Sequence, residues 1–422
     1  GVPRARAPRA WALGAAPARY RAGIAGVLGH RRDAKAVAPL AALAGASDTD
    51  TTTAQAAILS LGQIGTPEAA QALAKLAQDA PAGLHDALLE ARVTCADRLA
   101  EAGHTDEARK AFTALLETAP AGAARAAALT GLAMQGGAES RAQVIRALTG
   151  DEADLREAAT ALLVQGGDPE ADEEIVKALA NAAPEKQAAG LRILARRPGA
   201  ASRTWAQEMA QAENPEVRLA AIEALGEIGD GSVVELLVRT AATGKGAERQ
   251  AARASLASLP TQDADDAVIR LLESLTGKSG RENARLRQEL VTALEERHTT
   301  QSVPVLLAAA TDPDSGVRSR AFKALAALAD GSQAEKLVAL LLEAKPDAVR
   351  REAEKAVVAT CRRVADNSAR ADAVIAALDR AQKPAVVASL VRALGRIGTP
   401  EALAVLREKL GSLETDPETL DA

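Results

Sequence analysis

The string Leu61-Gly-Gln-Ile-Gly65-Thr-Pro-Glu-Ala69 returns almost unchanged as Leu394-Gly-Arg-Ile-Gly398-Thr-Pro-Glu-Ala402, and its first half returns as Leu225-Gly-Glu-Ile-Gly229-Asp-Gly-Ser232. Each copy has the features of a turn between two helices. Its last glycine stands where a helix ends, a place that often requires a positive φ. The threonine or aspartate that follows can accept hydrogen bonds from the first amides of the next helix, and proline suits the first helical position. The recurrence predicts repeated helix pairs.

A second recurring string opens the first helix of a pair. It reads Asn214-Pro-Glu-Val-Arg218, Asp312-Pro-Asp-Ser-Gly-Val-Arg318 and Lys345-Pro-Asp-Ala-Val-Arg350. After Val217 and Val317, and after Val386 of a later helix, apolar residues follow at i+4, i+5 and i+8, which is the spacing of one buried helical face. We predict about twelve helix pairs, whose first helices begin near residues 19, 51, 81, 121, 151, 183, 214, 246, 281, 313, 346 and 384.

The composition indicates thin, closely packed helical layers. Only 1% of the 422 residues are aromatic, whereas 48% are hydrophobic, so alanine and leucine must build the core. The formal net charge of −5 and the scarcity of aromatic side chains argue against a nucleic-acid-binding surface, which needs basic stripes and stacking platforms. We therefore expect a protein partner and no nucleic acid.

Two further absences in the sequence limit the cellular setting. No run of about eighteen apolar residues occurs, so the sequence predicts no membrane span. Residues 1–20 carry four arginines but lack the apolar block of a secretory signal. The sequence also begins without an initiator methionine, as a processed or excised polypeptide would, so the compartment stays undetermined.

The motifs that resemble catalytic or metal sites have simpler explanations. Gly277-Lys-Ser279 looks like the end of a phosphate-binding loop, but the first glycine of that motif is replaced by Leu272 and no strand precedes it, so we expect a plain turn. The four histidines share no ligand spacing. Cys95 and Cys361 lie in amphipathic helices without a neighbouring cysteine, which favours small buried apolar residues. We predict no catalytic residue, no metal and no cofactor.

The two recurring strings and the two-helix period together resemble the HEAT-repeat superfamily, over about residues 19–412. The alanine-rich texture also resembles long HEAT arrays of planctomycetes and verrucomicrobia, which often accompany sugar-active or cytochrome modules. The resemblance implies an all-α, right-handed α-α superhelix whose second helices line a concave surface, and it implies no catalytic residues. None of the histidines is followed by the glutamate that the HEAT-type hydroxylases need, and the basic, aromatic groove of HEAT-like DNA glycosylases is missing.

The two ends of the sequence have opposite charges. We divide the chain into a basic extension (1–18), a single solenoid (19–412) and an acidic tail or truncated repeat (413–422). Residues 1–35 hold seven arginines and one lysine against the single acid Asp33, whereas four carboxylates close the chain: Glu414, Asp416, Glu418 and Asp421. Either the ends associate head to tail, or they are solvated open edges of the repeat array. The oligomeric state is open.

Three arginines occupy the same position in the three copies of the second recurring string, which favours a structural role. Arg218, Arg318 and Arg350 each follow the turn proline by three to five residues, so we expect each to bond to turn carbonyls or to an acidic side chain of the adjacent repeat, with a ligand site as the alternative. Trp205 and Met209 share a helical face, which favours a core position over an exposed anchor. Basic residues on the predicted second helices are the candidate contacts for a partner: Lys75, Arg109, Arg146, Lys177, Arg239 and Arg270.

Two functions remain open. The first is a non-catalytic scaffold or adaptor that binds a protein along the concave face of the solenoid. The second is an accessory domain that positions a catalytic module, sugar-active or redox, located elsewhere on a longer polypeptide or on a partner protein.

Overall fold

The computed structural model describes residue 13 and residues 16–166 and 170–414. These residues form 24 α-helices, joined by turns and short 3-10 helices, and the helices follow one another as twelve pairs. The chain divides into two compact units, Gly1–Ile193 and Leu194–Ala422, and each is described by itself. Most of the predicted extension and tail lies outside the described residues, including the first three arginines and the last three carboxylates.

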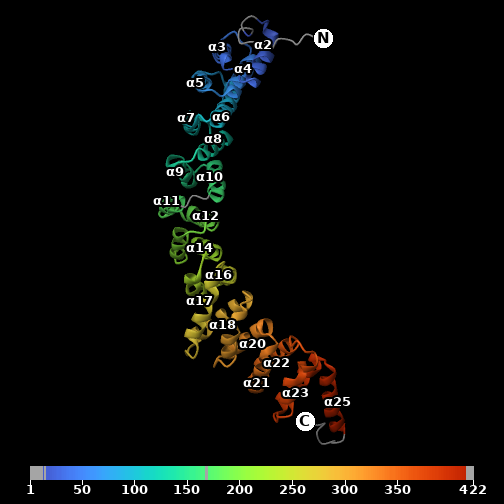
Figure 1. Ribbon diagram of the computed structural model, residues 1–422. Helices are drawn as coiled ribbons and strands as arrows, with labels where there is room; N and C mark the ends of the chain where they lie inside the picture. The colour runs from blue at the N-terminus through green and yellow to red at the C-terminus, as the bar shows by residue number, and fades with distance from the viewer. Residues whose placement is uncertain (1–12, 14–15, 167–169, 415–422) are drawn as a thin grey trace, which may run out of the picture. The chain divides into compact units, whose positions relative to one another are not determined.

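The first unit alternates first and second helices up to the unit boundary (Figure 1). Its first helices are α2 (Ala18–His30), α4 (Thr51–Ile64), α6 (His85–Glu101), α8 (Ala123–Met134), α10 (Ala153–Gln165) and α12 (Pro184–Leu194), whose last residue belongs to the other unit. Its second helices are α3 (Val37–Gly45), α5 (Pro67–Leu76), α7 (Thr105–Thr118), α9 (Ala138–Thr149) and α11 (Glu170–Leu179).

The second unit begins with the second helix α13 (Ala200–Met209) and continues the alternation. Its first helices are α14 (Pro215–Ile228), α16 (Gly246–Ser258), α18 (Arg281–Glu296), α20 (Ser315–Leu328), α22 (Asp347–Cys361) and α24 (Pro384–Ile397). Its remaining second helices are α15 (Val234–Thr243), α17 (Gln262–Leu275), α19 (Val303–Ala309), α21 (Ala334–Glu343), α23 (Asp372–Leu378) and α25 (Pro400–Glu414).

The predicted repeat is confirmed. Each of the twelve first helices begins within four residues of its predicted start, the largest difference being at α6, predicted near 81 and observed at His85. Within each unit, successive first helices pack on one another, as α2, α4, α6, α8 and α10 do, and as α14 through α24 do. In the first unit the labelled second helices lie along one side of this stack (Figure 1). The protein is an all-α solenoid.

The glycines of the recurring turn string do not all serve one purpose. Gly65 and Gly398 end their helices with φ of 63° and 76°, as predicted. The prediction is wrong for Gly229, which has φ −71° and ψ 163°. A short 3-10 helix follows it, so the backbone leaves α14 in extended conformation. Glycine is needed there for space instead, because a Cβ would lie 2.3 Å from Leu225 O and 2.7 Å from Leu259 Cδ2.

Small residues bring neighbouring first helices close together. A Cβ on Gly62 of α4 would stand 2.6 Å from the carbonyl oxygen of Ala91 on α6, and 2.8 Å from its Cα. In the second unit, the Ser255 hydroxyl on α16 donates to the Ile222 carbonyl of α14 at 2.8 Å. Backbone thus meets backbone across the repeat interface, which explains why alanine, glycine and serine replace aromatic residues in this core.

We expect Gly62→Ala to lower the free energy of unfolding by about 1–3 kcal/mol, because the added methyl overlaps Ala91. Gly26→Ala is the matched control. Gly26 is also helical, lies in α2, and has nothing within 4 Å of the position that a methyl would take, so alanine should be neutral or stabilising by about 0.5–1 kcal/mol. Urea titration of the full-length protein, followed by circular dichroism, measures both. Equal stability of the two variants would contradict the close approach.

Candidate interaction surface

Arg218 joins two successive repeats of the second unit. It lies on the fourth residue of α14, where its Nη1 donates to the Ala212 and Glu213 carbonyls of the preceding turn at 2.8 and 2.7 Å. Its Nε and Nη2 donate to Glu248 Oε1 at 3.1 and 2.7 Å. Glu248 lies in the first turn of α16. One guanidinium therefore stabilises its own turn and the start of the next repeat.

Arg318 repeats this geometry with a different acceptor. Its Nη1 donates to the Asp312 and Pro313 carbonyls at 2.6 and 3.0 Å, and its Nη2 donates to the Lys345 carbonyl at 2.5 Å. Lys345 belongs to the turn before α22. The contact between repeats thus uses a main-chain oxygen here, where Arg218 uses a carboxylate.

Arg350, the third arginine of this register, has a local contact. Its Nη1 donates to Asp347 Oδ1 at 2.7 Å, one turn earlier in α22. Its Nε is buried and has no hydrogen-bond partner among the described residues. The guanidinium therefore bonds to an acidic residue of its own helix, which differs from the turn carbonyl or adjacent repeat predicted for its register.

Sequence reasoning missed the most deeply buried arginine of this series. Arg287 of α18 is 2% exposed, and its Nη2 donates to Asp312 Oδ1 at 3.0 Å, while its Nη1 donates to the Lys278 and Leu275 carbonyls. It is the seventh residue of its helix, one turn later than the fourth position of the recurring string. The helical period could have found it, because residues three apart share a face.

A second missed arginine holds the opposite end of a first helix. Arg297, after the end of α18, donates through Nη1 to the Leu256 and Leu259 carbonyls at the end of α16, both at 3.0 Å. Its Nε donates to Asp265 Oδ1 at 2.5 Å. Carbonyls at a helix end lack partners inside the helix, so a cation is favourable there.

The six predicted partner contacts lie on second helices, four in the first unit and two in the second. Arg109 is half-buried, whereas the others are exposed: Lys75, Arg146, Lys177, Arg239 and Arg270. Three of the six pair with a carboxylate of their own helix: Arg109 with Asp106, Lys177 with Glu173, and Arg239 with Glu235. Within the described part of the chain, no hydrogen bond joins any two of the six. Within each unit they lie on successive second helices rather than at one site.

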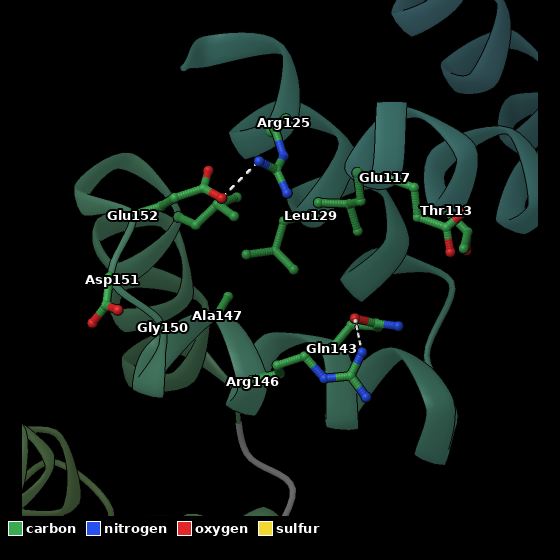
Figure 2. Close-up of a pocket in the computed structure, with 12 residues that line it drawn as sticks. Thr113, Glu117, Arg125, Leu129, Gln143, Arg146, Ala147, Gly150, Asp151 and Glu152 are labelled. Carbon is green, nitrogen blue, oxygen red and sulfur yellow. Dashed lines mark hydrogen bonds and ion pairs between the residues drawn. The ribbon is translucent and has the colours of Figure 1, made fainter. Parts of the chain in front are cut away.

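Arg146 lies at a pocket formed by three successive repeats of the first unit (Figure 2). The pocket has a volume of about 270 Å³, and α7, α8, α9 and α10 line it. Arg125 and Glu152 stand on one side, joined by a 2.6 Å hydrogen bond, and Arg146 and Gln143 stand on the other (Figure 2). Leu129 lies between them. The pocket was not predicted.

The residues that the sequence suggested as possible functional sites lie in the core or in a turn. Trp205 is buried, as the core interpretation predicted, and both cysteines are buried. Gly277-Lys-Ser279 lies in the turn between α17 and α18. Across the described ranges, no cluster of three or more histidine, cysteine or carboxylate side chains is placed to hold a metal ion. Nor does any described helix combine the length and the apolar character needed to cross a membrane.

Two family models for helical repeats match the sequence. The family model for HEAT repeats matches residues 7–91, 172–257 and 269–358, and the model for PBS lyase HEAT-like repeats matches residues 386–412. No protein of curated function matches the sequence.

Several solved structures are similar to the chain at low identity. An engineered protein is 19% identical, with a TM-score of 0.28, over 86% of this chain and 99% of its own. Importin-β is 14% identical, with a TM-score of 0.38, over 90% of this chain and 60% of its own. Human deoxyhypusine hydroxylase is 20% identical, with a TM-score of 0.25, over 61% of this chain and 96% of its own.

We expect Asp312→Ala to lower the free energy of unfolding by about 3–5 kcal/mol, because it leaves the Arg287 guanidinium buried without its carboxylate. The control is Glu235→Ala, which breaks the exposed pair with Arg239 and should change stability by less than about 1 kcal/mol. Thermal and urea unfolding of both variants measure the difference. Similar losses in the two would mean that burial of the Arg287 pair adds nothing.

The two thiols should resist modification in the folded protein. Burial raises the pKa of Cys95 to about 12 and that of Cys361 to about 11, so at pH 8 both stay protonated and shielded. Ellman's reagent should therefore react with neither thiol in buffer and with both in concentrated urea. Rapid reaction of either thiol in buffer would show that its helix opens readily.

Proposed function

The chain belongs to the HEAT-repeat family, and on that premise we propose that it is a non-catalytic scaffold that holds a protein partner along its second helices. In the arrangement that the family implies, these helices line the concave face. The HEAT array is typical of proteins that bind other proteins over long surfaces without a deep pocket.

The observation that carries this proposal is a set of exposed second-helix cations that take no part in holding the repeats together. On the first helices, the side chains of Arg218, Arg287 and Arg318 donate hydrogen bonds to turn carbonyls and to neighbouring repeats. On the second helices, Lys75 and Arg270 are exposed, and neither side chain forms a hydrogen bond or ion pair with a described residue. Charges that do not hold the stack together remain available to a partner.

Arg146 belongs to the same available set. Its side chain makes one hydrogen bond to a described residue, a 3.4 Å contact from Nη1 to Gln143 Oε1 at the long end of the range, and it forms no ion pair with a described carboxylate. Exposed cations of this kind mainly raise the association rate and select acidic partners, and their effect falls with salt. We therefore expect a partner surface with an excess of acidic residues.

The test is affinity capture of the tagged full-length protein from cell extract, with mass spectrometry of the proteins that co-elute at low and moderate salt. We expect a stoichiometric protein that dissociates as salt rises. Replacement of Lys75, Arg146 and Arg270 by glutamine should weaken its capture by about tenfold or more, at about 0.5–1 kcal/mol for each exposed charge.

The matched control replaces three exposed first-helix arginines by glutamine: Arg281, Arg285 and Arg351. It makes the same change in net charge, so capture should stay within about twofold of the wild type. Equal loss in both variants would indicate a net-charge effect and contradict the second-helix surface. Capture of an enzyme as the stoichiometric protein would favour the accessory role, with the solenoid positioning a catalytic partner.

A further inference from the structure

The pocket beside Arg146 has an apolar floor. Leu116 of α7, Leu129 of α8, Ala147 of α9 and Leu155 of α10 line it, and all four side chains are at least nine-tenths buried in the folded protein. Its volume of about 270 Å³ is larger than one aliphatic side chain needs, so a branched side chain and part of its backbone would fit. The floor is made by helices of three successive repeats, and it therefore depends on their stacking.

The charges around this floor are largely compensated from within the protein. Glu152 accepts a hydrogen bond from Arg125 at 2.6 Å. Asp151 accepts one from Lys186 at 2.8 Å, which lowers the pKa of its carboxyl, and its side chain points away from the pocket (Figure 2). Arg146 and Glu117 remain, one of each sign, so the lining carries no excess charge beyond its internal pairs. A neutral occupant fits better than a carboxylate or an ammonium group.

The rim offers donors and acceptors from different helices. Arg146 and Gln143 supply donors from α9, while Glu117 and the Thr113 hydroxyl supply acceptors from α7 (Figure 2). A peptide amide presents one acceptor and one donor in a fixed relation. The rim can therefore satisfy a backbone carbonyl on one side and a backbone N–H on the other, while the side chain lies on the leucines.

We propose that this pocket binds a branched aliphatic side chain of an extended partner segment, whose backbone amides bond to the α7 and α9 rim. The proposal rests on the scaffold function and names one place on the second-helix surface where the partner is recognised. Arg146 then contributes a hydrogen bond to the partner's backbone in addition to its long-range charge.

The test uses four small probes and the full-length protein labelled at its leucine methyl groups. N-acetyl-L-leucine N-methylamide is neutral and has both amides. N-acetyl-L-leucine adds a carboxylate, L-leucine N-methylamide adds an ammonium group, and N-acetylglycine N-methylamide lacks the side chain. The neutral leucine probe should shift the Leu129 methyl signals saturably. It should bind about tenfold tighter than the glycine probe and about threefold or more tighter than either charged probe.

Two substitutions of alanine by methionine test where the probe binds. Ala147→Met fills the pocket and should weaken the neutral leucine probe by about tenfold or more. Ala114→Met places the same side chain in a separate pocket, lined by α5, α6 and α7, and should leave binding within about twofold. Unchanged methyl spectra away from the substitution verify that both variants fold.

Several outcomes would overturn the proposal: tighter binding of a charged probe, equal binding of the glycine probe, no saturable shift, or insensitivity to Ala147→Met. None of these outcomes would contradict the scaffold function, which is tested separately by capture of the partner and by the variants of the second-helix cations. Conversely, a failed capture with a filled pocket would leave this site as a peptide-binding pocket without the proposed scaffold role.

Discussion

Every helix pair in this protein has an apolar face that it cannot bury alone, and the rest of the structure follows from how neighbours bury it. The first helices approach until backbone meets backbone, as Gly62 does at Ala91, and the Ser255 hydroxyl donates to the Ile222 carbonyl across the same kind of interface. Such short separations leave no room for large side chains. The near absence of aromatic residues is therefore a consequence of the stacking distance, with Phe112, Trp205 and Phe322 as buried exceptions.

Close stacking brings the turns into register, and their carbonyls need donors. Arginine supplies these donors with one rigid fork, which reaches the turn of its own repeat and the start of the next. Arg218 and Arg318 do this at the N-terminal ends of first helices, while Arg297, just after the end of α18, donates to carbonyls of the preceding repeat. These arginines thus stabilise the stack, whereas the side chains of Lys75 and Arg270 on the second helices form no hydrogen bond or ion pair with a described residue.

Much of this architecture could be predicted because it is periodic. The turn strings and the i, i+4 spacing located all twelve first helices, since each copy of the repeat reports the same local geometry. Gly229 was misjudged because its string matches Gly65 while the following residues form a 3-10 helix. Arg287 was missed because it sits one turn off the consensus position. The pocket could not be predicted at all, since side chains from four helices form it and no single string records their meeting.

The arginine contacts differ in how much they demand of the neighbouring repeat. Arg218 needs a glutamate at one position of the next helix, whereas Arg318 needs only the Lys345 carbonyl, which any residue would provide. A junction made through a main-chain oxygen does not depend on which residue provides that oxygen. At such a junction, duplication, loss or exchange of a whole helix pair would leave the hydrogen bonds of both neighbouring repeats in place. The length of the array can therefore change there during evolution. The Arg218–Glu248 junction, in contrast, would have to be inherited as a unit.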